Sequence, residues 1–144
     1  MDRLETQIKE PDAADTLTFS QLRAANIARL KLFKNSAGET AHFYADGSDW
    51  SINDWLVAIT GELGEACNLA KKLRRGDFDK ADAVPADVAA KEGVKTYGEW
   101  LANELADVQI YLDILVYQFR LDLGEIVRRK FNKTSERIGV DTRL

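Results

Sequence analysis

The chain has 144 residues, enough for one domain with a modest core, and its 45% hydrophobic and 31% charged residues are typical of a soluble protein. The formal net charge of −4 argues against non-specific binding of nucleic acid, which needs a basic surface. The single cysteine excludes a disulfide within the chain. No apolar run reaches the roughly 18–20 residues that span a bilayer, and the N-terminus has no apolar signal segment. We therefore expect a cytoplasmic protein without a membrane partner.

Helical periodicity interrupted by only two prolines predicts an all-α protomer of four to five helices. Residues 1–17 are polar, and we expect a flexible segment there, followed by a single helical domain over residues 18–144. Thr18 begins a capping box that opens the first helix. Because its apolar stripe continues to Phe33, we expect this helix to end at residues 35–38.

Ser51 begins a second capping box, and the helix that it opens is predicted to run to about Arg75. Gly76 is the expected C-terminal stop of this helix, since glycine adopts the left-handed conformation easily. Residues 76–96 form an excursion before the next long helix. Within it, Pro85–Glu92 is expected to make a short helix.

A third long helix is predicted from about Tyr97 to Arg120, and a last one from about Leu123 to Ile138. The Tyr97–Arg120 helix is apolar around most of its circumference, so it should be buried all round. Four or five helices cannot achieve this alone, and we therefore expect a homodimer or homotetramer in which this helix joins a shared bundle.

Two pairs of acidic residues are the most informative feature of the chain: Glu62 with Glu65, and Glu104 with Asp107. Each pair has i, i+3 spacing, which places both carboxylates on one face of a helix. Two such helices facing each other would bring four carboxylates together, and these repel strongly unless a cation lies among them. Carboxylate oxygens suit Mg²⁺ or Mn²⁺, and a Mg²⁺ held in this way usually also contacts a substrate phosphate.

Helical projection indicates that at least three of these acids point inward. At about 100° per residue, Glu62 lies within roughly 20° of Trp55, and Glu104 within roughly 20° of Tyr111. Salt bridges to lysine or arginine could also satisfy such acids, in which case the chain would be a non-enzymatic helical interaction module. A di-iron bundle is excluded because it needs Glu-x-x-His pairs, and the only histidine, His42, is on neither acidic helix.

These motifs resemble a known family. Gly61-Glu-Leu-Gly-Glu-Ala66, then Glu104-Leu-Ala-Asp-Val108 and then Arg129-Lys-Phe-Asn132 are similar to the signature of the MazG-like all-α nucleoside triphosphate pyrophosphohydrolases. The likeness covers roughly residues 18–138 and is greatest to the short, stand-alone forms of bacteria and their phages. The spacer between the acid pairs, residues 66–103, is longer than is typical of that family, and the excursion accounts for its length.

The resemblance implies Mg²⁺-dependent hydrolysis of a nucleoside or deoxynucleoside triphosphate to its monophosphate and pyrophosphate, serving control of the nucleotide pool. By family analogy, Glu62, Glu65, Glu104 and Asp107 would hold two or more Mg²⁺ ions, with Mn²⁺ as a substitute. Either Glu62 or Glu65 would orient or deprotonate the attacking water. A phosphohydrolase that removes a single phosphate is a further alternative.

Five other residues are candidates for binding the substrate. Lys72 lies about 20° from Glu65 and two turns along the helix, so its ammonium group would reach a phosphate bound at the acids. The alternative is that Lys72 is solvated or forms a salt bridge. Lys130 and Asn132 would hold the triphosphate or ribose. Asn26 lies in an apolar stripe, where it would read a base edge or make a buried structural hydrogen bond. Trp50 is a candidate for the pocket rim.

Overall fold

The computed structural model describes residues 16–34, 37–40, 44 and 47–144. These residues form five helices, and the only β-type pairing among them consists of two isolated bridges, Lys34 with Thr40 and Ala83 with Thr96. The predicted all-α class with four to five helices is confirmed. Most of the segment predicted to be flexible, residues 1–17, lies outside the described residues.

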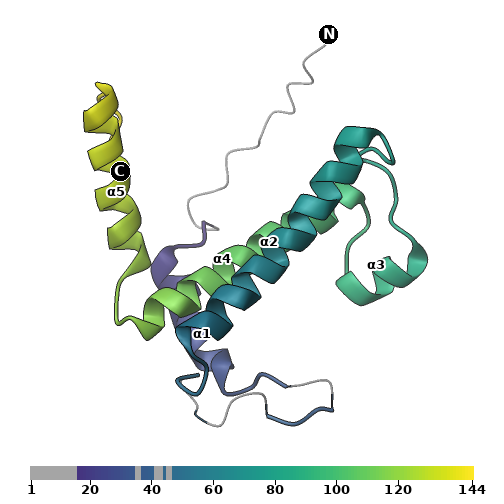
Figure 1. Ribbon diagram of the computed structural model, residues 1–144, viewed down its shortest axis with the longest axis horizontal. Coiled ribbons are helices and arrows are strands. Elements are labelled where there is room, and N and C mark those ends of the chain that lie inside the picture. The colour runs from purple at the N-terminus through teal and green to yellow at the C-terminus, as the bar shows by residue number, and fades with distance from the viewer. Residues whose placement is uncertain (1–15, 35–36, 41–43, 45–46) are drawn as a thin grey trace.

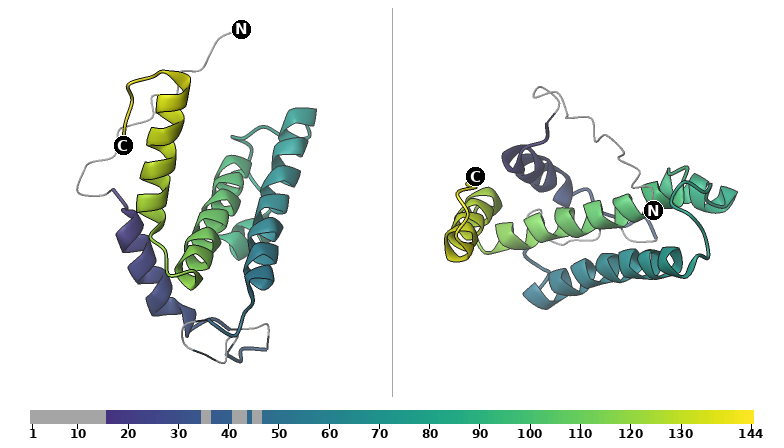
Figure 2. Two further views of the ribbon diagram at one scale, coloured as in Figure 1. Left: turned by 60° about the vertical axis from the view of Figure 1, so that its left-hand side comes forward. Right: turned by 90° about the horizontal axis from the view of Figure 1, so that it is seen from above.

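Two long antiparallel helices, α2 (Ile52–Arg75) and α4 (Tyr97–Gln118), lie side by side and form the centre of the protein (Figure 1). In the view from above, α1 (Phe19–Leu30) lies on the opposite side of α4 from α2 (Figure 2). The short helix α3 (Ala86–Glu92) lies in the connection from α2 to α4, and α5 (Leu123–Ile138) diverges from the far end of α4. Helix α4 is therefore the element that the others pack around.

The helix starts follow from local side-chain capping. The hydroxyl groups of Thr18 and Ser51 accept hydrogen bonds from the first turns of α1 and α2, and each capping box is complete. The predicted stop of α2 is confirmed, because Gly76 adopts the left-handed conformation with a φ of 77°. Helix α3 begins after Pro85 as predicted.

The predicted end of α1 is wrong. The helix ends at Leu30, and the next residues form tighter turns in which the amide of Leu32 donates to Arg29 and that of Phe33 to Leu30. Leu30 is fully buried, so the chain turns as soon as this side chain reaches the core. Helix α4 also ends two residues before the predicted position, because Arg120 adopts a left-handed conformation with a φ of 58°.

The apolar core lies where the end of α1, the start of α2 and the second half of α4 meet. Its buried members are Leu30, Trp55, Ile114 and Leu115. Trp50 packs against Trp55 with ring centroids 4.7 Å apart. This core anchors one end of the α2–α4 pair, about two turns away from the acidic residues on each helix.

A buried polar cluster of Arg23, Asn26 and Asp113 joins α1 to α4. Asp113 has no exposed surface, and its Oδ2 accepts a 2.9 Å hydrogen bond from Nδ2 of Asn26. Its Oδ1 accepts from Nε of Arg23 at 3.0 Å, and the guanidinium also donates to the carbonyl oxygen of Leu121 at 3.0 Å. The buried carboxylate is thus fully paired, which fixes how α1 crosses α4.

Large apolar side chains remain exposed on the central helices. Leu105 of α4 is 50% exposed. On α2, Leu56 and Leu63 are each 45% exposed and Val57 is 72% exposed. The described residues of one chain therefore leave part of α4 uncovered. Among the described residues, no helix combines the length and apolar character needed to cross a membrane.

Candidate metal centre

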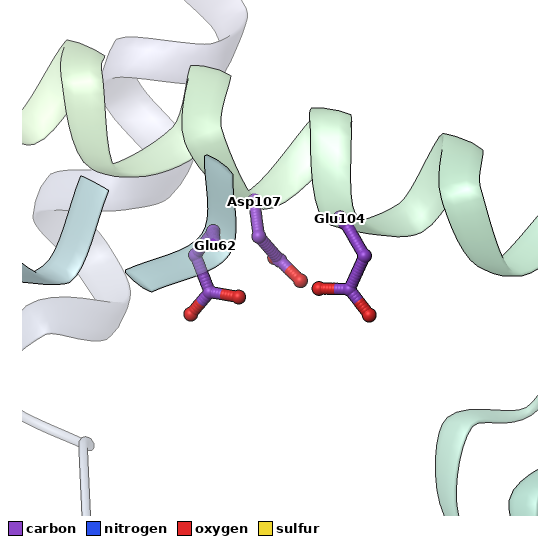
Figure 3. Close-up of side chains that lie close together, drawn as sticks. All are labelled: Glu62, Glu104 and Asp107. Atoms are coloured by element: carbon purple, nitrogen blue, oxygen red, sulfur yellow. The ribbon is translucent and has the colours of Figure 1, made fainter. Parts of the chain in front are cut away.

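Three of the four acids converge between α2 and α4. Glu62 projects from α2, while Glu104 and Asp107 project from successive turns of α4, and the three carboxylates point to the same side (Figure 3). One carboxylate oxygen from each residue lies within 4.8 Å of one in each of the others. The i, i+3 spacing on α4 and the antiparallel packing of α2 produce this arrangement.

The burial of the acids agrees with the expected inward orientation of at least three of them. Glu104 is only 4% exposed, and Glu62 and Asp107 are half-buried. Glu65 is exposed and lies outside the group of three, although its charge acts on both Glu62 and Glu104. The acid cluster, by which we mean Glu62, Glu104 and Asp107, is therefore narrower than the predicted four-residue site.

Burial and mutual repulsion act strongly on Glu62. Its pKa is raised to about 7, first by loss of solvation and then by the negative charges of Asp107, Glu104 and Glu65. A hydrogen bond with Glu104 raises it further. Near neutral pH, Glu62 can therefore share a proton with Glu104 in place of a cation.

Glu104 is held by an aromatic neighbour on its own helix. The indole Nε1 of Trp100 donates a 2.6 Å hydrogen bond to Oε1 of Glu104, one turn further along α4. Burial raises the pKa of Glu104, whereas the hydrogen bond from Trp100 opposes this by favouring the charged form. The sequence analysis missed Trp100, although its i, i+4 spacing to Glu104 was available as a signal.

Basic side chains do not neutralise the acid cluster. Within the part of the chain that the structure describes, no ion pair includes Glu62, Glu104 or Asp107. Lys72 is half-buried further along α2, and Lys130 is exposed on α5. The alternative of acids held by salt bridges to these lysines has no support in this geometry.

The charges of the acids act on two further side chains. The pKa of Tyr111 is raised by burial and then by the charges of Glu62 and Asp107. Lys91, near the end of α3, has its pKa raised mainly by Glu92 and further by Glu65 and Glu104. Helical projection of the sequence predicts that Tyr111 shares a face of its helix with Glu104. The periodicity of the sequence gives no indication of where Lys91 and its short helix lie relative to the acids.

Four of the other predicted site residues lie elsewhere in the structure, in α1, in α5 and just before α2. Asn26 is 2% exposed, and its amide group binds Asp113, which matches the alternative of a buried structural hydrogen bond. Asn132 bonds through its amide group to the backbone of Leu144. Because α5 diverges from α4 (Figures 1 and 2), Lys130 and Asn132 lie apart from the acids of their own protomer. Trp50 is half-buried against the core.

The donor set of the acid cluster fits a hard divalent cation. All three side chains offer carboxylate oxygens, which Mg²⁺ and Mn²⁺ prefer, and none offers sulfur or imidazole nitrogen. A bound cation would also relieve the repulsion that raises the pKa of Glu62. No protein-family model, no curated protein and no solved structure matches the chain. Functional inference therefore rests on this geometry and on the motifs.

Proposed function

We propose that the protein is a Mg²⁺-dependent pyrophosphohydrolase of nucleoside or deoxynucleoside triphosphates, releasing the monophosphate and pyrophosphate. The observation that carries the proposal is the convergence of Glu62, Glu104 and Asp107 oxygens within 4.8 Å of one another. An oxygen-only acidic site of this kind is suited to a cation that also binds phosphate. The bond that is cleaved, between the α and β phosphates, follows from the likeness of the two acid pairs to the MazG-like signature.

In this proposal, Glu62, Glu104 and Asp107 hold Mg²⁺ or Mn²⁺. The bound cation would neutralise the triphosphate and lower the pKa of a water molecule. Trp100 keeps the buried Glu104 carboxylate oriented and charged. Glu65 lies outside the acid cluster yet close enough for its charge to act on it, so it is the better placed of the two candidate bases to accept a proton from water.

We also infer that the active protein is a homodimer or homotetramer. The exposed apolar side chains of α2 and α4, among them Leu63 and Leu105, favour burial against a second copy. For Lys130 and Asn132 to bind phosphate as predicted, the assembly must bring α5 of one copy to the acid cluster of another. The predicted role of Lys72 does not need this, because Lys72 is on α2 itself.

The decisive experiment incubates the purified protein with Mg²⁺ and a panel of all common NTPs and dNTPs, and identifies the products by chromatography and mass spectrometry. We expect monophosphate and pyrophosphate in equal amounts from at least one nucleotide. Diphosphate with inorganic phosphate would instead establish the single-phosphate alternative. If no nucleotide yields a product, the enzymatic proposal fails, and the alternative of a non-enzymatic interaction module is favoured.

A matched pair of variants links turnover to the acid cluster. Glu104→Gln should lower turnover by at least about a hundredfold, because it removes a charged ligand from the metal site. Glu136→Gln makes the same chemical change at an exposed position on α5 and should leave turnover unchanged. Circular dichroism of both variants would show that helicity is retained. Equal activity of the two variants would contradict the proposed site.

A further inference from the structure

The excursion between α2 and α4 is closed on itself next to the start of α4. The amide of Val84 donates to the carbonyl oxygen of Lys95 at 3.1 Å, and the amide of Tyr97 donates to that of Asp82 at 3.1 Å. Val84 and Val94 are both buried. Backbone hydrogen bonds therefore join the two ends of the segment that carries α3.

The closure is tight at Gly98. Its amide donates to the carbonyl oxygen of Lys80 at 2.9 Å, and a Cβ atom at this position would lie only 2.9 Å from the same oxygen. Only glycine allows the two backbones to approach so closely. The base of the excursion is thus held firmly against the first turn of α4.

The C-terminal end of α3 contacts α4 at the residue next to Glu104. The side chain of Asn103 donates from Nδ2 to the carbonyl oxygen of Glu92 at 3.4 Å, and Asn103 directly precedes Glu104 in α4. The ammonium group of Lys91 pairs with the carboxylate of Glu92 at 2.6 Å. One short helix therefore carries a cation and a carboxylate to the edge of the proposed metal site.

The charges of these residues act on the acids. Glu65 and Glu104 both stabilise the charged form of Lys91, after the larger effect of Glu92, and the charge of Glu92 in turn contributes to the raised pKa of Glu104. Lys91 lies on the solvent side, with 83% of its side chain exposed. An exposed ion pair contributes little to stability, so Lys91 can exchange Glu92 for a more highly charged partner.

We propose that Lys91, at the C-terminal end of α3, binds phosphate oxygens of the substrate at the edge of the acid cluster. This inference rests on the proposed function, since it assigns a binding residue to the same site. A triphosphate approaching Glu62, Glu65, Glu104 and Asp107 meets strong negative charge, and a flexible ammonium group on the approach offsets it. Glu92 pairs with this ammonium group in the absence of substrate and is displaced by the phosphate.

Equilibrium binding tests the inference without any need for turnover. Isothermal titration calorimetry measures the affinity for Mn²⁺ alone and for inorganic pyrophosphate in saturating Mg²⁺, for the wild-type protein and four variants. Lys91→Gln should weaken pyrophosphate binding about threefold to fivefold, because one exposed charge contact is lost. The same variant should bind Mn²⁺ slightly more tightly, because a like charge is removed from the surroundings of the site.

The remaining variants separate binding from a structural role. Lys91→Arg should retain pyrophosphate affinity, and Glu92→Gln should retain or increase it because Lys91 loses its competitor. Lys95→Gln removes a charge from the same excursion and should change neither affinity. Opposite effects of Lys91→Gln on the two ligands would exclude mere loosening of α3, which would not tighten Mn²⁺ binding.

Two results would overturn the inference in distinguishable ways. If the wild-type protein hydrolyses nucleotides but Lys91→Gln leaves pyrophosphate affinity and the nucleotide KM unchanged, Lys91 does not bind phosphate and the proposed function stands. If the wild-type protein binds neither Mn²⁺ nor pyrophosphate, the proposed function fails and this inference fails with it.

Discussion

Trp100 and Glu104 form a hydrogen-bonded pair along α4, with the indole Nε1 2.6 Å from Oε1 of the carboxylate. The bond favours the charged form of Glu104 and opposes the effect of its burial. A buried carboxylate that binds a cation needs such a partner, because without it the carboxylate would take up a proton or the side chain would rotate away from the site.

Trp100→Phe should weaken Mn²⁺ binding about tenfold, since it removes the hydrogen bond but keeps an aromatic ring beside Tyr97. The pKa of Glu104 should rise further in this variant, so the loss of affinity should be larger at pH 6 than at pH 8. Mn²⁺ titration at both pH values measures this difference. A uniform loss at both pH values would show that the hydrogen bond does not control the charge of Glu104.

The stability of the metal-free protein should fall as the pH rises from about 4.5 to 7. Glu62 has a pKa of about 7 in the folded protein and 4.5 as its ordinary value, so the folded state binds more protons in this interval. The free energy of unfolding therefore decreases with rising pH and levels off above pH 7. Thermal unfolding in EDTA across this range measures the change.

Two comparisons assign this pH dependence to the acid cluster. Glu62→Gln should flatten the profile, because the repulsion from Asp107 and Glu104 no longer acts on a titrating group. At pH values above 7, excess Mg²⁺ should raise the melting temperature of the wild-type protein. It should raise the melting temperature of Glu62→Gln less, because this variant lacks one of the proposed ligands. A wild-type profile that is flat in EDTA would argue against clustered acids.

Asp113→Ala should destabilise the protein by about 3 kcal/mol, because it leaves the Arg23 guanidinium and the Asn26 amide without their buried partner. Chemical denaturation measures this free energy. Arg128→Ala breaks an exposed pair with Glu125 and should cost less than about 1 kcal/mol. Similar losses for both variants would show that the buried cluster does not fix α1 on α4.

Leu105→Glu should dissociate the oligomer, since a charge would replace an apolar side chain that is 50% exposed on the central helix. Light scattering coupled to size exclusion measures the mass of the assembly. Leu32→Glu alters a side chain that is 63% exposed beyond the end of α1, and should leave the assembly intact. A wild-type protein that is a stable monomer would remove the oligomer proposal.

The parts of the fold that depend on local chemistry could be predicted from the sequence. The capping residues Thr18 and Ser51 and the stop at Gly76 act within one turn of chain, so reading them needs no tertiary information. The end of α1 could not be predicted in this way. The apolar stripe continues to Phe33, but the burial of Leu30 decides where the chain turns.

The acid cluster could be predicted only in part for a similar reason. Spacing and projection place Glu62, Glu104 and Asp107 on the inward faces of their helices, as the structure has them. How closely their carboxylates approach depends on the packing of α2 against α4, which the sequence does not give. The placement of Lys91 was beyond sequence analysis. It depends on the closure of the excursion, which is made by backbone groups that leave no pattern in the side chains.

The tight closure at Gly98 makes the segment between α2 and α4 tolerant of changes in its length and sequence. Residues 85–94 leave and rejoin the chain at nearly the same point, because the backbone on either side is paired. This loop could be exchanged or shortened without altering the distance between α2 and α4, and hence without moving the acids. In the proposed function, the residues that would hold the cation and the residue that would meet the substrate therefore lie on separately supported segments, so a change in one need not disturb the other.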